Sequence, residues 1–380
     1  MIRFITSGES HGEYLVGILE GIPSKLKIDK NFIKEKLKLR RVGYGRSERM
    51  KIEEDEFEFF GGIDENNNTT GAPIGFKVLN LDYKINKTKR FSNIPRPGHV
   101  DYSGSIKYDF DNFYLPSERR SGRLTVLDVI AGSICEIFLN EFGIKNYFFV
   151  SSIGKIDIPV KNAIEKIEEL FPKILSSNLL LPYSEYEEKI KDEIDKTKKL
   201  GETLGGSGVV IVKNFPPGLG DYNNYKENLD GLLAQAIISI PSVKGFEIGD
   251  GISSSYKYGS EVQDEFFIEQ NRLKRKSNNS GGIEGGVSNG EDIIIKFYSK
   301  PIPTVIKKLK SVDIFNWVEK ETEYVRSDIT AIPAITIVAS SRVSIVLANE
   351  LKKKFCGDNI LDLKKNFENY IESRRRFWQR

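Results

Sequence analysis

The sequence predicts an α+β fold, with strands and helices in mixed order along the chain. Short apolar runs typical of buried strands and longer stretches with helical spacing follow one another, without the regular alternation of a doubly wound sheet. Apolar residues make up 39% of the composition, which is enough for a substantial core. Because the chain has 380 residues, one large domain and two closely associated domains are both compatible with its length.

The first half of the chain carries two strand signals and two helix signals. Residues 2–6 form a short apolar run that predicts a buried strand. Residues 29–39 predict a helix, because Asp29 suits an N-cap and apolar side chains recur on one side. Residues 74–81 predict a strand, and residues 124–139 predict an apolar helix that ends before a glycine.

The second half contains charged helices and then more apolar elements. Residues 161–175 and 184–200 predict amphipathic helices, in which Glu187 and Lys191 are spaced to form an ion pair. The remaining elements are expected in this order: a buried strand at 209–212, a helix at 225–240 that stops at a proline, a strand at 292–297, and helices at 342–355 and 361–378.

Two loop histidines are the first candidates for chemistry. The chain holds only His11 and His99, each next to glycine and among polar or charged neighbours. Histidine changes charge near neutral pH and therefore suits proton transfer. A single loop histidine is more often an ordinary surface residue, but two similar loops favour an active site.

Arginines next to glycine, proline or serine are the second recurring feature. Guanidinium groups bind carboxylates and phosphates through paired hydrogen bonds, so this repetition indicates a site for a small polyanion. For the cluster at residues 40–49, a solvated basic loop is an equally good interpretation. The arginines concerned stand at positions 40, 46, 49, 96, 119, 120, 123 and 326.

Three further stretches are suited to binding an anion or a ligand. The Arg-Ser-Gly turn at residues 120–122 opens a predicted helix, whose N–H groups and dipole favour a phosphate. Residues 281–290 contain five glycines and resemble a backbone-lined ligand loop, although a flexible surface loop is the alternative. In residues 300–304, two prolines stiffen a turn between a lysine and a threonine.

Composition argues against several other classes of protein. The net charge is only +3, which gives no general support for a nucleic-acid or membrane-surface role. The N-terminus lacks the apolar core of a signal peptide, and no uninterrupted apolar run reaches membrane-spanning length. Cys135 and Cys356 look like small hydrophobes, and the chain offers too few ligands for a conventional zinc site. We therefore expect a cytoplasmic protein without a metal.

Several motifs, taken together and in order, resemble the chorismate synthase family. The resemblance extends over roughly residues 1–355, nearly the whole chain. The matching stretches are residues 8–12, 43–46, 70–74, 96–101, 243–251, 281–290, 300–304 and 326–328.

The resemblance implies the last step of the shikimate pathway. 5-Enolpyruvylshikimate 3-phosphate loses phosphate and its C6 proton to give chorismate, and the family requires reduced FMN although the reaction has no net redox change. The protein supplies position and charge around the cofactor. Carried over to this sequence, His11 would protonate the departing phosphate and His99 the reduced flavin, while Asp328 would help to relay the proton from flavin N5.

The resemblance also implies binding residues and a fold. The substrate-side positions are Ser10, Arg40, Arg46, Arg96, Arg123 and Arg326. The flavin-side positions are Arg119, Arg120, Ser121, Pro241, Ser242, Gly285, Lys300, Pro301, Ile302, Pro303, Thr304 and Arg326. The family fold is a β-α-β sandwich with helices between antiparallel sheets, and its members are usually homotetramers. We expect one catalytic domain over residues 1–355 and a basic helical tail over 356–380.

Some family members reduce their own flavin with NADPH. This chain shows no extra domain for that task, so we expect an external flavin reductase. The chain departs from the family where Glu at position 124 and Arg at position 128 are usual, because it has Leu124 and Asp128, and Arg120 stands where small residues are typical. The joint change suggests a lost local salt bridge more than a lost catalyst, because both histidines and Asp328 remain.

Two other hypotheses remain open at the level of the sequence. A divergent, non-catalytic homologue that binds flavin or an acidic partner is compatible with the changes at positions 124 and 128. A single-stranded nucleic-acid binder would use arginines with nearby Tyr44, Tyr102 and Tyr108. The small net charge disfavours the second hypothesis.

Overall fold

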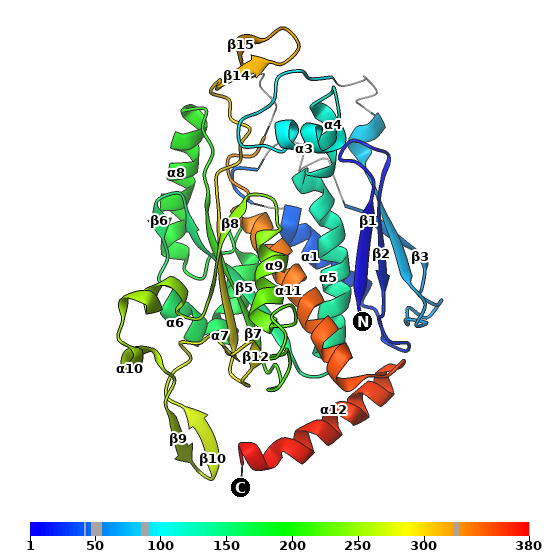
Figure 1. Cartoon of the computed structure of the whole chain (residues 1–380), viewed down its shortest axis with the longest axis vertical. Helices are drawn as coiled ribbons and strands as arrows, with labels where there is room; N and C mark the ends of the chain where they lie inside the picture. Colours follow the sequence, from blue (N-terminus) through cyan, green and yellow to red (C-terminus); the bar gives the residue numbers. More distant parts are fainter. Residues whose placement is uncertain (42, 47–54, 85–90, 323–326, 380) are drawn as a thin grey trace.

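The protein is a three-layer sandwich in which helices lie between two antiparallel sheets (Figure 1). The computed structural model describes residues 1–41, 43–46, 55–84, 91–322 and 327–379. The predicted α+β class and the helices-between-sheets arrangement are both confirmed. Two of the arginines singled out in the sequence, Arg49 and Arg326, lie outside the described residues.

One outer layer is a four-stranded sheet built from the N-terminal part of the chain. Its strand order is β1-β2-β4-β3, and every neighbouring pair is antiparallel. The inward side chains of this sheet include Leu15, Phe76 and Val78, which are completely buried. The strands are β1 (Arg3–Ser7), β2 (Tyr14–Glu20), β3 (Phe57–Gly61) and β4 (Ile74–Leu79).

The other outer layer is a five-stranded antiparallel sheet from the second half of the chain. Its order is β6-β5-β7-β13-β8, so sequence-distant strands become neighbours. Residues 209–212 are completely buried, as their continuous apolar run predicts. The strands are β5 (Lys145–Ile153), β6 (Ile156–Asp157), β7 (Gly206–Lys213), β8 (Val243–Ile248) and β13 (Ile293–Ser299).

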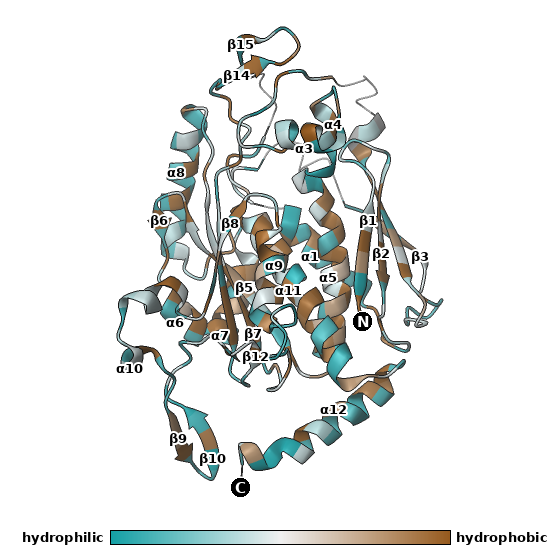
Figure 2. Ribbon diagram, viewed as in Figure 1, coloured by the Kyte–Doolittle hydropathy of each residue, from teal (hydrophilic) through white to brown (hydrophobic). Residues whose placement is uncertain are grey.

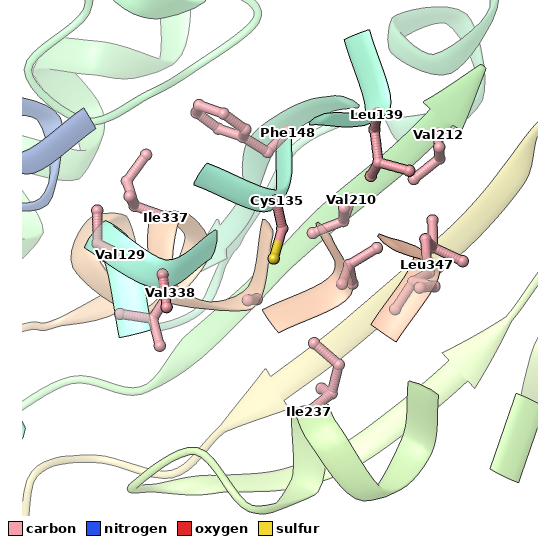
Figure 3. Packing of buried hydrophobic residues seen from close by; sticks show 14 of the residues in the cluster. Val129, Cys135, Leu139, Phe148, Val210, Val212, Ile237, Ile337, Val338 and Leu347 are labelled. Carbon is pink, nitrogen blue, oxygen red and sulfur yellow. The ribbon is translucent and has the colours of Figure 1, made fainter. Parts of the chain in front are cut away.

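The middle layer consists of four helices: α1 (Lys30–Arg41), α5 (Thr125–Asn140), α9 (Leu229–Ile238) and α11 (Ile332–Phe355). Figure 2 shows apolar residues concentrated along α5, α9 and α11 and on the strands that face them. In Figure 3, Cys135 of α5 lies among Val210 of β7 and Val338 of α11, so this thiol packs as a small apolar group. Cys356 differs, because it is exposed at the end of α11.

Helix α11 is long and apolar enough to cross a membrane by composition alone. However, 78% of its most apolar window is buried inside the fold. It packs against α5, α1 and α9 and against strands of the second sheet. Its sequence therefore reflects a core position within the sandwich.

Two short helices cover the end of the sandwich at which α5 begins. They are α3 (Asp101–Tyr108) and α4 (Tyr114–Arg119), and they lie side by side at the top of Figure 1. The 3-10 turn η2 (Gly122–Leu124) leads from α4 into α5, and η1 (Leu81–Lys84) follows β4. The hairpin of β14 (Lys310–Asp313) and β15 (Val318–Glu321) projects beyond these helices.

The remaining elements lie on the outside of the sandwich. They are α6 (Val160–Glu165), α7 (Ile167–Ser176), η3 (Ser184–Tyr186), α8 (Glu187–Lys199), η4 (Gly251–Tyr256), α10 (Gly259–Val262), β9 (Phe266–Glu269), β10 (Arg272–Arg275), β11 (Ile283–Glu284), β12 (Val287–Ser288), α12 (Ile360–Arg374) and η5 (Arg375–Phe377). The predicted pair between Glu187 and Lys191 is present at 3.1 Å. Leu363 of α12 is buried against the core. The division into a catalytic domain that ends at residue 355 and a C-terminal tail stays a prediction.

Four predicted elements differ from the observed ones. The helix at 161–175 is two helices, α6 and α7, which meet at Lys166 in a non-helical conformation. The helix at 225–240 begins only at Leu229, and the C-terminal helix ends at Arg374. Helix α11 begins at Ile332 instead of 342, because residues 332–341 are buried all round and show no amphipathic spacing.

Candidate functional site

His11 lies in the loop between β1 and β2 and is held by helix α4. Its ring Nδ1 lies 2.8 Å from Glu118 Oε1, and its backbone N–H donates to Glu118 Oε2 at 2.8 Å. The Tyr114 hydroxyl lies 2.9 Å from the same ring nitrogen. The loop turns at Gly8, where φ is +104° and an added Cβ would lie 2.4 Å from the Tyr14 carbonyl oxygen, so a side chain is excluded. The chain therefore fixes this imidazole by contacts more than 100 residues apart in sequence.

Burial alone would raise the pKa of the Glu118 carboxyl. Hydrogen bonds from the His11 ring and backbone and from the Tyr114 hydroxyl outweigh burial and hold that pKa below its ordinary value. Glu118 is therefore a carboxylate at neutral pH, and it places a negative charge directly against His11.

His99 precedes α3 and is held in a similar way. Its Nδ1 contacts Asp101 Oδ1, and Asp101 also accepts from Arg96 Nε at 2.7 Å and from Arg96 Nη2 at 2.9 Å. Burial would raise the pKa of Asp101, but the His99 and Arg96 hydrogen bonds lower it to about 2. The predicted Arg-Pro-Gly-His-Val-Asp stretch is thus a local cluster around one buried carboxylate.

The two histidine loops meet through the packing of α3 against α4. Gly104 of α3 lies so close to Pro116 of α4 that a Cβ there would come within 2.5 Å of the proline ring. His99 adjoins the start of α3, and Glu118 of α4 holds His11. Both imidazoles are therefore attached to one helix pair at one end of the sandwich (Figure 1).

The turn at residues 300–304 connects the His99 loop to Asp328. Lys300 Nζ donates to the Gly98 carbonyl at 2.7 Å, next to His99. At the other end of the turn, the Ser327 hydroxyl donates to the Thr304 carbonyl at 2.6 Å. This turn therefore joins the loop before α3 to the segment before α11.

Asp328 is paired with a predicted substrate-side arginine. Its Oδ2 lies 2.9 Å from Arg46 Nη1, and both side chains are mostly buried. The Ile329 N–H donates to the Gly45 carbonyl at 2.9 Å, which holds the two segments together. Residues 45–46 and 328–329 are thus neighbours, and a predicted substrate-binding arginine forms an ion pair with a predicted catalytic aspartate.

Arg40 and Arg123 share one buried carboxylate, Asp55. Arg40 Nη1 lies 3.3 Å from Asp55 Oδ2, and Arg123 Nη1 contacts Asp55 Oδ1. Arg40 also donates to Thr125 Oγ1 at 3.1 Å, which ties the end of α1 to the start of α5. Burial lowers the pKa of Arg40 to about 10 despite the neighbouring Asp55. Both arginines are therefore engaged within the protein, and their predicted contacts with a substrate stay a prediction.

Asn80 links this arginine pair to the His11 loop. It accepts from Arg123 Nε at 2.9 Å and donates to the Gly12 carbonyl at 2.7 Å and the Ser10 carbonyl at 3.5 Å. Ser10 itself is buried. The predicted Ser10 and Arg123 therefore belong to one hydrogen-bonded network with His11.

The predicted flavin-side stretches come together around the end of α9. Arg120 Nη2 donates to the Ser239 carbonyl at 2.9 Å, and Lys300 N–H donates to the Ser242 carbonyl at 2.9 Å. Arg119 Nη1 donates to the Gly8 carbonyl at 2.7 Å, and Ser121 caps the turn before α5. The arginines, Pro241, Ser242 and the 300–304 turn are therefore contiguous.

Gly285 is not part of that cluster. It lies in the β11–β12 turn, and the adjacent Gly286 carbonyl accepts from Leu229 N–H at the opposite end of α9. A ten-residue helix spans about 15 Å, which separates this turn from Ser239. Its role in flavin binding stays a prediction.

A cavity of about 360 Å³ opens beside His99. Arg96, Lys310 and Ser311 contribute to its wall together with His99 and Tyr102. Two cations, an imidazole and three hydroxyl side chains, including Ser103, line this cavity and suit an anionic ligand.

Sequence reasoning missed three residues that organise the site: Glu118, Asn80 and Asp55. Glu118 directly precedes Arg119 and Arg120. A carboxylate beside this arginine-rich stretch was the only sequence feature that could have pointed to it. Asp55 and Asn80 carry no local signal, because their partners lie far away in sequence.

A sandwich with loop histidines, paired carboxylates and recurring arginines at one end is the framework of an enzyme for a small anionic metabolite. A family model described as chorismate synthase matches residues 2–351. The chorismate synthase of Carboxydothermus hydrogenoformans is 42% identical, with 98% of this chain and 99% of the relative covered. That of Caldicellulosiruptor saccharolyticus is 44% identical, with 94% and 97% covered.

A solved structure agrees with these relatives. The crystal structure of a chorismate synthase superposes with a TM-score of 0.82 at 35% identity, and the match covers 98% of both chains. This chain belongs to the chorismate synthase family.

Proposed function

We propose that this chain converts 5-enolpyruvylshikimate 3-phosphate to chorismate in the shikimate pathway of aromatic amino acid biosynthesis. The reaction is an anti-1,4-elimination: the C3–O bond breaks, phosphate leaves, C6 loses a proton and a second ring double bond forms. The observation that carries the proposal is family membership over nearly the full length of the chain. The connected network of His11, His99, arginines and Asp328 supports it.

Each of the three catalytic candidates has a partner suited to its role. His11, against the Glu118 carboxylate, would give a proton to the departing phosphate. Asp328, paired with Arg46, would carry away the proton lost from C6. His99 would hold a proton next to the cofactor. Ser10, Arg40, Arg46, Arg96, Arg123 and Arg326 are the proposed substrate-side residues.

Reduced FMN fits the residues of the proposed flavin side. Lys300 donates to the Gly98 carbonyl beside His99. Arg119, Arg120 and Ser121 form a cationic, hydrogen-bonding set just before α5, which suits a flavin phosphate. A Cβ at neighbouring Gly122 would meet no atom within 4 Å, so this turn is open to a ligand. That side would be completed by Pro241, Ser242, Pro301, Ile302, Pro303, Thr304 and Arg326, whereas Gly285 lies at the opposite end of α9. Bound there, reduced FMN would supply electron density for cleavage of the C–O bond.

We extend the proposal to the surroundings of the enzyme. The flavin is reduced by an external reductase, with NADPH as the indirect source of electrons. The enzyme is a cytoplasmic homotetramer, with one catalytic domain over residues 1–355 and a helical tail over 356–380. Neither a nucleic acid nor a membrane is a partner.

An anaerobic assay tests the proposal. The full-length protein is incubated with dithionite-reduced FMN and the enolpyruvyl substrate, and chorismate absorbance and phosphate are measured together. We expect both products only with reduced FMN, and loss of turnover in His11→Ala and His99→Ala. Equal turnover with oxidised FMN, or without flavin, contradicts the mechanism. Binding of FMN and substrate without chorismate formation favours a non-catalytic homologue.

A further inference from the structure

Both histidines use the same ring nitrogen to contact a buried carboxylate. His11 Nδ1 faces Glu118 Oε1 at 2.8 Å, and His99 Nδ1 contacts Asp101 Oδ1. Glu118 is 5% exposed and Asp101 is 3% exposed. The two loops have different sequences and lie on different elements, so the shared geometry is a property of the site.

The geometry around Glu118 requires a proton on His11 Nδ1. One carboxylate oxygen accepts from the His11 backbone N–H, and the other faces Nδ1. The His11 backbone N–H and the Tyr114 hydroxyl donate to the same carboxylate and favour its ionised form, so the oxygen that faces Nδ1 acts as an acceptor. An unprotonated Nδ1 would place a lone pair against a carboxylate at hydrogen-bond distance, which is repulsive.

The same argument applies to His99. Asp101 accepts two hydrogen bonds from the Arg96 side chain and one from the Arg96 backbone N–H at 3.1 Å. These bonds and the His99 contact keep Asp101 ionised, with a pKa lowered to about 2. The oxygen facing His99 therefore acts as an acceptor, and Nδ1 of that ring is the donor.

We infer that Glu118 and Asp101 are positioning residues that hold His11 and His99 in the tautomer with the proton on Nδ1. Proton exchange with the reacting molecules is thereby assigned to Nε2 of each ring. The carboxylates also stabilise each imidazolium that forms during turnover. The assignment of the tautomers stands on the geometry alone, whereas their use in catalysis rests on the proposed function.

Two described contacts offer rival arrangements. At His99, Arg96 Nη2 lies 3.1 Å from Nδ1, but it also donates to Asp101 Oδ1 at 2.9 Å. At His11, the rival donor is Tyr114. Its hydroxyl lies 2.9 Å from His11 Nδ1 and would donate to that nitrogen if the proton were on Nε2. In the arrangement that we infer, the hydroxyl donates to Glu118 instead, a hydrogen bond that also helps to lower the pKa of that carboxyl. Removing this hydroxyl therefore separates the two arrangements.

The test uses the fact that the chain has only two histidines. Full-length protein labelled with 15N-histidine gives four imidazole nitrogen signals, which magic-angle-spinning NMR resolves in sedimented protein of any assembly size. Proteins with His11→Gln and His99→Gln assign the signals. We expect both neutral rings to carry the proton on Nδ1, unlike free histidine, which favours Nε2.

Matched variants show which carboxylate sets which ring. In Glu118→Gln, the amide can accept from only one of the two His11 donors, so we expect the His11 signals to change and the His99 signals to stay. Asp101→Asn should do the reverse, and Tyr114→Phe should keep the Nδ1 proton on His11. In each variant, the signals of the other histidine report whether the protein is folded. The wild-type spectrum alone tests whether both neutral rings carry the proton on Nδ1.

The inference is overturned if wild-type His11 or His99 carries its neutral-state proton on Nε2, or if Tyr114→Phe moves the His11 proton. It is also overturned if Glu118→Gln leaves the His11 signals unchanged. None of these measurements uses substrate or flavin. A failed turnover assay would therefore refute the proposed function and leave the tautomer assignment intact. A failed NMR test would refute the tautomer assignment and leave the proposed function intact.

Discussion

Asp128 of α5 and Arg342 of α11 form a two-point ion pair in the helix layer. Arg342 Nε lies 3.1 Å from Asp128 Oδ1, and Arg342 Nη2 lies 3.3 Å from Oδ2. Arg342 Nη1 also donates to the Ala236 carbonyl at 3.1 Å and to Ser239 Oγ at 2.5 Å, at the end of α9. Burial raises the pKa of Asp128 despite Arg342. Position 128, where the resemblance led us to expect a lost salt bridge, thus carries the carboxylate of an ion pair between α5 and α11.

Replacing Arg342 by lysine tests whether the Arg342 guanidinium, through its hydrogen bonds to Ala236 and Ser239, holds the end of α9 in place. Lysine keeps the charge but cannot bond a carboxylate through two nitrogens and a helix end through the third. We expect a loss of about 2 kcal/mol in the free energy of unfolding. Denaturant titration measures the loss, and hydrogen exchange should quicken at residues 236–239. The same change at Arg3, an exposed residue paired with Glu20, should cost less than 0.5 kcal/mol. Equal losses of unfolding free energy at Arg342 and Arg3 would contradict a specific stabilising role for the Arg342 guanidinium.

Gly132→Ala should destabilise the contact between α5 and α11. A Cβ at Gly132 would lie 2.4 Å from Ser341 Cβ and 2.5 Å from its backbone, so the helices would have to separate. Alanine is favoured over glycine in helices by about 1 kcal/mol, but we expect overpacking to outweigh this and give a net loss of about 2 kcal/mol.

Gly231→Ala is the control for this substitution. Gly231 also lies in a helix, α9, but its nearest neighbour to an added Cβ is 3.7 Å away. We expect a gain of a few tenths to about 1 kcal/mol in the free energy of unfolding. If both substitutions changed the unfolding free energy in the same direction, α5 and α11 would have to adjust around Ser341 without loss of stability, which would contradict the prediction for Gly132.

Acid stability should depend on Asp101. Its folded-state pKa of about 2 lies below its ordinary value of 3.8, so its hydrogen bonds stabilise the fold above about pH 4. That contribution is lost as the pH falls from about 4 to 2, and it amounts to about 2 kcal/mol. Asp101→Asn should therefore flatten the dependence of unfolding free energy on pH in this window. Asp230→Asn, at a half-buried aspartate of α9 outside this cluster, is the control substitution. An equal flattening in both variants would contradict the role of Asp101.

Local signals in the sequence predicted several elements correctly. Asp29 accepts from the Asn31 and Phe32 N–H groups and caps α1 as predicted, because capping is determined by adjacent residues. The buried strand at 209–212 also follows from its composition alone. In contrast, no local pattern predicts the antiparallel β9–β10 hairpin, because its side chains are largely exposed and show no alternation.

The site shows the same limit of sequence reasoning. The histidine loops and arginines stand out because each carries a dense local motif. The Glu118 contact with His11 spans 107 residues, and the Asp55 contact with Arg123 spans 68 residues. Pairings at that range are decided by how α4 and the sheet pack together, so no spacing rule finds them.

Glu118→Gln should lower kcat much more than it changes KM. His11 keeps its place on the loop, but the amide cannot accept from both the ring and the backbone N–H, so the ring loses its fixed orientation and the adjacent negative charge. General acid catalysis contributes roughly 10²–10⁴-fold to rates, and we expect a fall in kcat of at least about 10²-fold with KM changed only a few-fold. Steady-state kinetics under anaerobic conditions with reduced FMN measures both constants.

Glu141→Gln is the matched control for this prediction. Glu141 follows the far end of α5 and pairs with Lys364 on the surface, so its replacement should leave kcat near the wild-type value. A rise in KM at constant kcat in Glu118→Gln would mean that Glu118 shapes the binding pocket and leaves proton transfer untouched, because only ground-state affinity would then have changed. A fall in kcat that Tyr114→Phe reproduces in full would instead identify the hydroxyl as the group that orients His11.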